Sequence, residues 1–142
     1  MKLSKASAQA ALAMAFLATC PTGELVQART IGEQLNVPTD SALKILQALS
    51  RRGLIVSQLG RSGGYRMHRP AQSVTLLEIV EAIDGPICGD IPLQLESAPR
   101  ASRLDVLHDV CNRAAMTVRQ RLAEITVAHL APIDQPAPAT VV

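Results

Sequence analysis

Two short amphipathic helices and a glycine-rich hairpin follow one another between residues 28 and 68, and this order constrains the fold most. Residues 28–35 predict the first helix, in which Ile31 and Leu35 are four positions apart and share one face. The Asn-Val-Pro sequence at 36–38 ends this helix, because proline disfavours helical geometry in the residue before it. The turn to the next helix is therefore only three residues long.

The second helix is predicted over residues 40–52, with Thr39 as its N-terminal cap and an acidic residue in its first turn. Arg51 and Arg52 lie in its last turn, where cations stabilise the helix dipole, and Gly53 ends it. The side expected to be buried carries three leucines, each three positions from the next: Leu43, Leu46 and Leu49. Two helices joined by so short a turn indicate a helix-turn-helix.

A β-hairpin is predicted directly after this pair of helices. Residues 54–59 are mostly β-branched or apolar and indicate one strand, and residues 65–68 indicate the returning strand. The Gly-Arg-Ser-Gly-Gly sequence at 60–64 supplies the glycines that a tight reversal requires. This loop lacks the strand-then-helix context of a nucleotide-binding loop, so it is interpreted as a wing. The sequence therefore predicts a mainly α fold with a small β-hairpin, a winged helix-turn-helix.

The second half of the chain is predicted to contain two more helices. Thr75 and Glu78 form a capping-box sequence that starts a helix extending to Ile83, and Gly85 and Pro86 end it. Residues 86–101 are predicted to be a loop, and Ser102 can cap the long helix that follows. We thus expect a DNA-binding domain over 1–85, a loop over 86–101, a dimerisation helix with a short end segment over 102–130, and a disordered tail over 131–142.

The long helix carries one apolar stripe at heptad-like spacing. This apolar seam consists of Leu104, Leu107, Cys111, Ala114, Val118, Leu122 and Ile125. A long helix with such a seam, placed beyond a small domain, typically pairs with its symmetry mate. The alternative is that the helix folds back onto its own core. We expect a homodimer.

Composition and charge exclude several classes of protein. One Phe, one Tyr and no Trp are too few aromatic residues for the base-stacking platforms that bind single-stranded nucleic acid. No apolar stretch is long enough for a membrane span, and three cysteines do not form a secreted disulfide framework. Residues 1–75 hold nine basic and three acidic residues, whereas residues 76–142 hold five basic and nine acidic ones. The basic half alone is therefore expected to contact an anionic partner such as double-stranded DNA.

The N-terminus allows two interpretations. Residues 1–20 have early lysines, an apolar run and Cys20, which together resemble an export signal. The same residues also fit an alanine-rich buried helix that ends near Cys20, where Pro21, Thr22 and Gly23 act as stop signals.

Several stretches resemble the Rrf-two (Rrf2) family of bacterial winged-helix regulators. They are Met-Lys-Leu-Ser at 1–4, residues 47–55, Gly-Gly-Tyr at 63–65, residues 74–85 and residues 125–130. This family includes the iron–sulfur cluster assembly regulator, the nitric-oxide-sensitive repressor and the cysteine-metabolism repressor. Because its first helix begins at the initiator methionine, the resemblance favours a helix and a cytoplasmic protein over an export signal.

The resemblance implies that residues 39–44 enter the major groove and that the tip of the wing lies at the minor groove. Asp40 can accept a hydrogen bond from a cytosine amino group or stabilise the helix dipole, and both roles stay open. Arg61 suits the negative potential of a narrow minor groove, although family members carry arginine slightly earlier, where this chain has Leu59. The candidate DNA-binding residues are Thr39, Asp40, Ser41, Lys44, Arg51, Arg61, Ser62, Gly63 and Arg66.

Cluster-bearing relatives hold an iron–sulfur cluster with three closely spaced cysteines, a pattern that this chain lacks. Cys88 lies in the loop and Cys111 follows 23 positions later, three residues after His108 on one helix face. These three residues are the candidate ligands, to which Asp105 or Asp109 could add a fourth, but we expect no metal and no cofactor. The alternatives are a loosely bound iron–sulfur cluster and a thiol switch through Cys88.

The function predicted from these residues is that of a sequence-specific DNA-binding transcription regulator, acting as a homodimeric repressor that responds to redox or iron–sulfur status. The alternative is a winged-helix module that binds a protein and not DNA. An enzyme is not expected and no catalytic residues are assigned, because the three histidines are separated and the acidic residues lie on amphipathic faces. The sequence predicts no membrane association.

Overall fold

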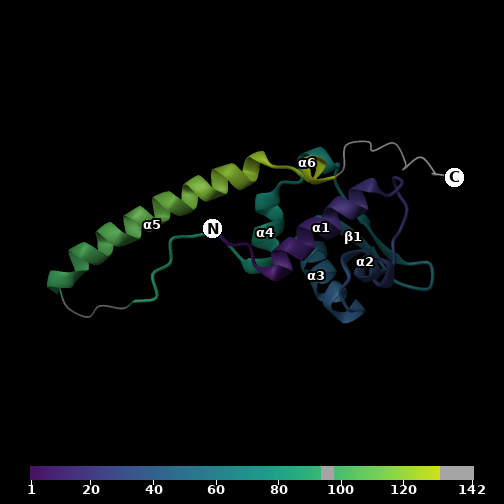
Figure 1. Cartoon of the computed structure of the whole chain (residues 1–142), viewed down its shortest axis with the longest axis horizontal. Coiled ribbons are helices and arrows are strands. Elements are labelled where there is room, and N and C mark those ends of the chain that lie inside the picture. The colour runs from purple at the N-terminus through teal and green to yellow at the C-terminus, as the bar shows by residue number, and fades with distance from the viewer. Residues whose placement is uncertain (94–97, 132–142) are drawn as a thin grey trace.

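The computed structural model of the chain describes residues 1–93 and 98–131. Within these ranges the chain forms a bundle of helices with a small hairpin at its edge, and one long helix projects away from the rest (Figure 1). In chain order the elements are α1 (Lys5–Thr19), α2 (Ala28–Leu35), α3 (Thr39–Arg51), β1 (Ile55–Gln58), β2 (Gly64–Met67), the 3-10 helix η1 (Ala71–Ser73), α4 (Leu76–Asp84), α5 (Ala98–Glu124) and α6 (Val127–Leu130). The expected tail at 131–142 lies outside the described residues except for Ala131.

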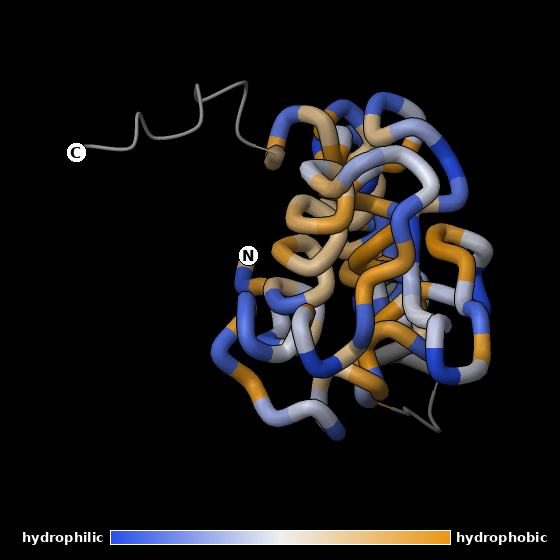
Figure 2. The backbone as a smooth tube through the Cα atoms, turned by 90° about the vertical axis from the view of Figure 1, so that its right-hand side faces the viewer, coloured by the Kyte–Doolittle hydropathy of each residue, from blue (hydrophilic) through white to orange (hydrophobic). Residues whose placement is uncertain are grey.

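Helix α1 is the centre of the fold, as the interpretation of the N-terminus as a helix predicts. It packs against α2, α3, α4 and α6, and its side chains Ala10, Met14 and Leu17 are buried. Alanines on this helix let neighbouring helices approach closely, and the apolar interior that results is visible end-on in Figure 2. Within the described residues, no helix is both long and apolar enough to cross a lipid bilayer.

Helices α2 and α3 form the predicted helix-turn-helix. Asn36 ends α2 in the left-handed conformation (φ 54°, ψ 47°), and the N–H of Val37 donates to the carbonyl of Gly32 (2.9 Å). A Cβ at Gly32 would lie 3.0 Å from the carbonyl oxygen of Val37, so the tight turn requires a residue without a side chain there. The predicted cap at Thr39 is wrong: Pro38 occupies the cap position and Thr39 is the first residue of the helix.

The buried face of α3 differs from the predicted leucine row. Leu46 and Leu49 are fully buried, but Ala42 and Ile45 complete the face and Leu43 is only half-buried. Residues three apart differ by about 60° around a helix, so a row with constant spacing of three drifts off the face. The four buried residues are separated by steps of three, one and three, and this spacing keeps them within one stripe of the helix.

The wing is an antiparallel hairpin in which Ile55 pairs with Met67 and Gln58 pairs with Gly64. Its outer edge is covered by Val26, which exchanges two backbone hydrogen bonds with Tyr65 (2.9 and 2.8 Å). No local sequence pattern predicts this third strand-like segment, because a single paired residue has no periodicity. The predicted first strand was too long at its end, since Leu59 lies outside β1.

Helix α4 begins with the predicted capping box: the Thr75 hydroxyl accepts from the N–H of Glu78, and the Glu78 carboxylate accepts from the N–H of Thr75. Helix α5 then begins at Ala98, four residues before the predicted cap at Ser102, with Pro99 in its first turn, where proline is tolerated. Part of the predicted 86–101 loop is therefore helical.

The end of α5 is attached to the winged domain. Leu122 is buried, the N–H of Leu76 donates to the carbonyl of Ile125 (2.7 Å), and the N–H of Val127 donates to the carbonyl of Val74 (2.9 Å). Helix α6 then packs on α1 and η1. Residues 125–130, which the sequence grouped with the dimerisation helix, thus complete the core of the winged domain.

Candidate nucleic-acid interface

The N-terminal half of α3 presents a row of polar side chains to solvent. Thr39, Asp40, Ser41 and Lys44 are all exposed, while the opposite side of the helix is buried in the core. An exposed helix with hydroxyl, carboxylate and ammonium groups within its first two turns can reach base edges and phosphates in a major groove. Arg51, at the other end of α3, is also exposed.

The tip of the wing presents Arg61 and Ser62, both exposed, beyond Gly60 with its positive φ of 107°. Gly63 is buried, and a Cβ there would lie 2.1 Å from the carbonyl oxygen of Gln58. The structure therefore gives Gly63 a role in closing the wing, which differs from the predicted role as a DNA contact. Its N–H donates to the carbonyl of Gly60 (3.0 Å), which fixes the turn that carries Arg61.

Arg66 lies apart from the other candidates. It is half-buried in β2 and lines a cavity of about 530 Å³ beside Cys20, Pro21 and His68. Its place on the returning strand puts it behind the wing tip and not at it. The structure thus brings together the α3 residues as one group and Arg61 with Ser62 as another, with Arg66 outside both.

Four of the candidate cations make no ion pair within the described part of the chain. Lys44, Arg51, Arg61 and Arg66 form no ion pair with any other described residue, whereas Arg69 at the base of the wing is paired with Glu78. Unpaired cations can replace the counterions of a nucleic-acid backbone without first breaking a contact within the protein.

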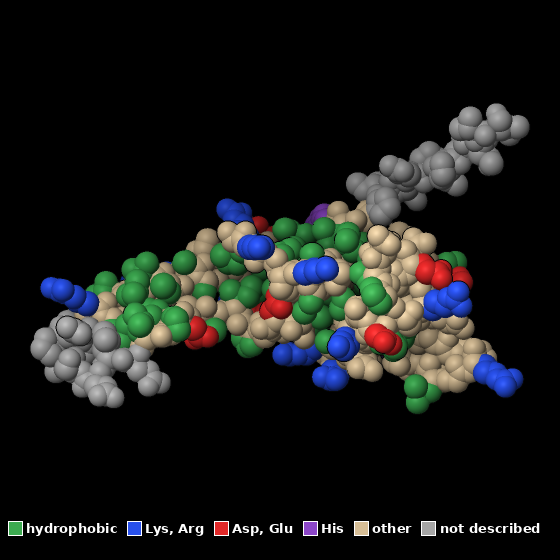
Figure 3. All heavy atoms as spheres, turned by 60° about the horizontal axis from the view of Figure 1, so that its bottom comes forward, with side chains coloured by type: hydrophobic (Ala, Val, Ile, Leu, Met, Phe, Trp, Pro, Cys, Tyr) green, Lys and Arg blue, Asp and Glu red, His purple; other side chains and the backbone are tan. Residues whose placement is uncertain are grey.

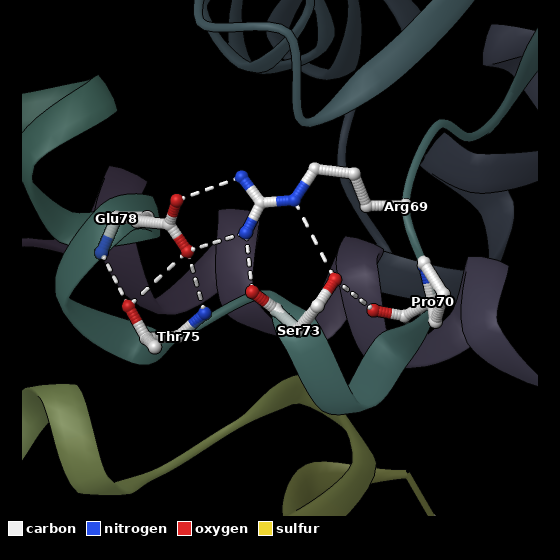
Figure 4. A network of polar contacts seen from close by, with 5 residues as sticks. All are labelled: Arg69, Pro70, Ser73, Thr75 and Glu78. Carbon is white, nitrogen blue, oxygen red and sulfur yellow. Dashed lines mark hydrogen bonds and ion pairs between the residues drawn. The ribbon is translucent and has the colours of Figure 1, made fainter.

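Arg69 and Glu78 tie the base of the wing to α4 (Figure 4). The two guanidinium nitrogens donate to the two carboxylate oxygens (Nη1–Oε1 2.8 Å, Nη2–Oε2 3.0 Å), and Nη2 also donates to the carbonyl of Ser73. The hydrogen bonds of this bidentate pair lower the pKa of Glu78 and raise the pKa of Arg69, because they stabilise the ionised form of each group, and the opposite charges add to both shifts. The pair positions the wing relative to the helices.

A hollow next to α3 contains polar residues that the sequence did not single out as a group. Lys5 and Gln9 of α1 line it together with Asn36 and Ser41, and its volume is about 520 Å³. The N-terminus of α1 therefore lies beside α3. Only Lys5, as a cation near the start of the chain, could have signalled this from sequence, because the proximity arises from tertiary packing.

The metal-ligand candidates are not brought together as a set. Cys88 and Cys111 line one cavity of about 600 Å³, but His108 does not line it. The Cys88 thiol donates to Asp90 Oδ2 (3.0 Å), and the adjacent carboxylate raises the pKa of Cys88. Within residues 1–93 and 98–131, no group of three or more His, Cys, Asp or Glu side chains is arranged to hold a metal ion.

A helix-turn-helix with an unpaired cationic wing and an exposed recognition helix defines the class of winged-helix DNA-binding regulators. Residues 3–132 match the model of the Rrf2 family, described as an iron-dependent transcriptional regulator. The chain belongs to this family, so it is a transcription regulator and not an enzyme, and the predicted winged-helix fold is confirmed.

Similar proteins span nearly the whole chain. A protein of Mycobacterium tuberculosis named as an HTH-type transcriptional regulator is 29% identical over 131 residues, covering 92% of this chain and 81% of that protein. The solved structure of CymR, the global cysteine regulator of B. subtilis, has a TM-score of 0.70 at 21% identity, covering 92% of this chain and 96% of that one. The structure of T. potens IscR has a TM-score of 0.64 at 19% identity, covering 92% and 85%.

The description of the family as iron-dependent raises the question whether these residues fit an iron centre. A [2Fe–2S] cluster requires four ligands, mostly thiolates, at fixed geometry. The described part of this chain supplies two thiols to one cavity and no third grouped donor. The donor set does not fit a cluster held by one protomer.

Proposed function

We propose that the protein is a homodimeric, sequence-specific repressor that binds double-stranded DNA in the cytoplasm. In this proposal α3 enters the major groove and the tip of the wing contacts the minor groove. The observation that carries it is the continuous exposure of Thr39, Asp40, Ser41 and Lys44 on one side of α3. These four neighbouring polar side chains contribute nothing to the protein core, whereas in a groove of DNA they can bind base edges and phosphates.

Different residues are assigned different roles in this complex. Thr39, Asp40 and Ser41 lie in the first turn of α3, from which base edges are read. Lys44 lies one turn further along the helix, and it is assigned a contact with a phosphate. Lys5, beside Ser41, and Arg51 are further phosphate contacts, since each is an exposed cation.

The second copy of the chain is assigned to the apolar seam of α5. Leu107 of the seam remains 46% exposed, and Val106 and Val110 on its flank are 64% and 56% exposed. Figure 3 shows apolar side chains gathered along the projecting helix, in the left part of the view. Exposed apolar side chains clustered on one part of a helix are favourably buried against the same helix of a second copy.

The test is a selection of binding sites from random DNA duplexes by the full chain, followed by affinity measurements at several salt concentrations. We expect one enriched palindromic motif, and we expect Lys44→Ala to lower affinity and flatten the salt dependence by about one unit of slope. Arg121→Ala is the matched control, because Arg121 is an exposed arginine of α5 paired with Glu124. Enrichment of no motif would contradict the proposal.

A second candidate function, a winged-helix module that binds another protein, is favoured by one observation. Leu59, next to the tip of the wing, is 93% exposed. An apolar side chain there suits a protein partner better than it suits a phosphate backbone. If no DNA motif is enriched, this function becomes the better account of the wing.

A further inference from the structure

Cys88 and Cys111 are 23 positions apart in the sequence but line the same cavity. The cavity, about 600 Å³ in volume, lies between the residues before α1, the end of α4 and the middle of α5. Both cysteines are free thiols in this structure, with Cys88 exposed and Cys111 partly buried. Two thiols in one cavity can react with each other as well as with a ligand.

The loop that carries Cys88 is in direct contact with the backbone of α5 at Cys111. The N–H of Gly89 donates to the side-chain oxygen of Asn112 (3.1 Å). A Cβ at Gly89 would lie 2.5 Å from the carbonyl carbon of Cys111 and 2.4 Å from the N atom of Asn112. Only glycine allows this approach, and Cys88 is the neighbouring residue in the chain, so the contact holds Cys88 beside the turn of α5 that carries Cys111. A disulfide requires such proximity, with a Cα separation of up to about 7 Å.

We propose that Cys88 and Cys111 are a redox pair, which a low-molecular-weight disulfide such as glutathione disulfide oxidises to an intramolecular disulfide, and that this bond lowers operator affinity. The part concerning affinity rests on the proposed function, whereas the formation of the bond does not. Two soft donors without a third suit this two-electron chemistry and not a cluster that needs four ligands.

The reaction takes place in two exchanges. The Cys88 thiol loses its proton and its sulfur attacks one sulfur of glutathione disulfide, which releases one glutathione thiolate and leaves a mixed disulfide on Cys88. The sulfur of Cys111 then attacks the Cys88 sulfur and releases the second glutathione. The protein loses two protons and two electrons, and one glutathione disulfide gains them to become two glutathione thiols.

Exposure assigns the order of these steps. Cys88 is reached first because it is open to solvent, and Cys111 resolves the mixed disulfide from inside the cavity. Asp90 accepts a hydrogen bond from the Cys88 thiol, and this hydrogen bond raises the pKa of Cys88. Cys20 takes no part, because it lies at the end of α1, where its thiol donates to the carbonyl of Phe16.

The position of the bond connects it to DNA binding. The cavity is also lined by Leu3 and Asp84, and Asp84 accepts hydrogen bonds from Ser4 (2.9 Å) and Ser7 (2.7 Å) of the α1 N-terminus. The bond thus forms at the joint of α1, α4 and α5. A cross-link from the loop to α5 fixes the angle between α5 and the winged domain, and in the proposed dimer this angle sets how two winged domains are spaced on one duplex.

The test is peptide mapping of the full chain after treatment with glutathione disulfide. Trypsin places the three cysteines in three different peptides, residues 6–29, 67–100 and 104–113. We expect the last two to be joined by a disulfide, the number of free thiols to fall from three to one, and the chain to run as a monomer on a non-reducing denaturing gel. Cys88→Ser and Cys111→Ser each abolish the link, and Cys20→Ser, the matched control, retains it.

A stable glutathione adduct on Cys88 with Cys111 still open to alkylation would overturn the proposal, as would covalent dimers or three unreacted thiols. Operator affinity is then measured on the oxidised wild type, where we expect a loss of about fivefold or more that dithiothreitol reverses. A linked protein with unchanged affinity would overturn the regulatory part. Reduced protein that selects no operator contradicts the proposed function alone and leaves the peptide result standing.

Discussion

The winged domain and the long helix α5 differ in how far each buries its apolar side chains within the single chain. In the winged domain, Met14, Ile31 and Leu46 are fully buried among neighbours from several helices. Along α5 the only fully enclosed residue of the described seam is Leu122, at the end that touches the winged domain, whereas Leu107 remains 46% exposed. One region is complete within a single chain, and the other is completed by a second copy in the proposed homodimer.

The ion pairs follow the same division: near the winged domain Arg119 of α5 pairs with Glu81 of α4, whereas farther out along α5 the ion pair joins residues of the same helix. The pair of Arg69 and Glu78 joins two elements and is about one-third exposed, while the pair of Arg113 and Asp109 stays within α5 and is mostly exposed. Contacts between elements fix a tertiary structure, whereas contacts within one helix stabilise only that helix. This comparison predicts that the stability of the winged domain and the proposed pairing of α5 can be changed separately.

The strongest test of this separation is Leu107→Asp. Symmetry would place two carboxylates in the seam of the dimer, and each uncompensated buried charge costs about 3–5 kcal/mol, so we expect a monomer at micromolar concentration. Met116→Asp is the control, because Met116 is 60% exposed and lies nine residues on, about half a turn round the helix. Sedimentation velocity that finds a dimer for both variants would contradict the role of the seam.

Leu46→Ala tests the other region. Leu46 is fully buried in the winged domain, so we expect the free energy of unfolding to fall by about 2–5 kcal/mol. Leu43→Ala, at the half-buried position of the same helix, should cost clearly less. Chemical denaturation monitored by circular dichroism measures both. Equal losses would mean that the predicted leucine row, and not the observed face, is buried.

Arg61→Ala is expected to weaken operator binding by about 1–3 kcal/mol and to relax the preference for A·T-rich positions that the wing contacts. The variant should leave the dimer and the free energy of unfolding unchanged, because Arg61 is exposed and makes no ion pair with another described residue. Fluorescence anisotropy on operators with altered flanks measures the change. Unaltered affinity and preference would remove the wing from the interface.

The smallest effect is expected from Glu78→Gln. Arg69 lowers the pKa of Glu78, so the ionised pair stabilises the fold above the ordinary carboxyl pKa and this contribution is lost as the pH falls through the lowered value. Because the pair is about one-third exposed, we expect only about 0.5–1 kcal/mol at pH 7. Asp109→Asn, on α5, should change almost nothing. The free energy of unfolding is measured for the wild type and for Glu78→Gln from pH 7 to pH 3. A difference between the two proteins that stays the same over this range would contradict the assignment.

Local sequence signals located most of the winged domain. The capping box at Thr75 and Glu78 and the breaks at Asn36 and Gly53 depend on neighbouring residues, and all of them appear in the structure. The errors arose where tertiary packing decides. Leu43 and Ile45 are both apolar but lie two residues apart, on nearly opposite sides of α3, and the packing of α3 against the rest of the domain decides that Ile45 is the one buried.

The candidate site could be predicted only in part for the same reason. The α3 residues and Arg61 follow from their position in the motif. The proximity of Lys5 to Ser41, the pairing of Val26 with Tyr65 and the return of residues 125–130 to the core are contacts between distant parts of the chain. No local pattern encodes such contacts.

The most direct test of the whole account is a hydroxyl-radical footprint of the full chain on its selected operator. Two winged domains joined through α5 predict two equivalent protected segments, related by a twofold axis and separated by one helical turn of DNA, about 34–36 Å, or a multiple of it. A single asymmetric footprint, or protection that does not depend on the DNA sequence, would contradict the account.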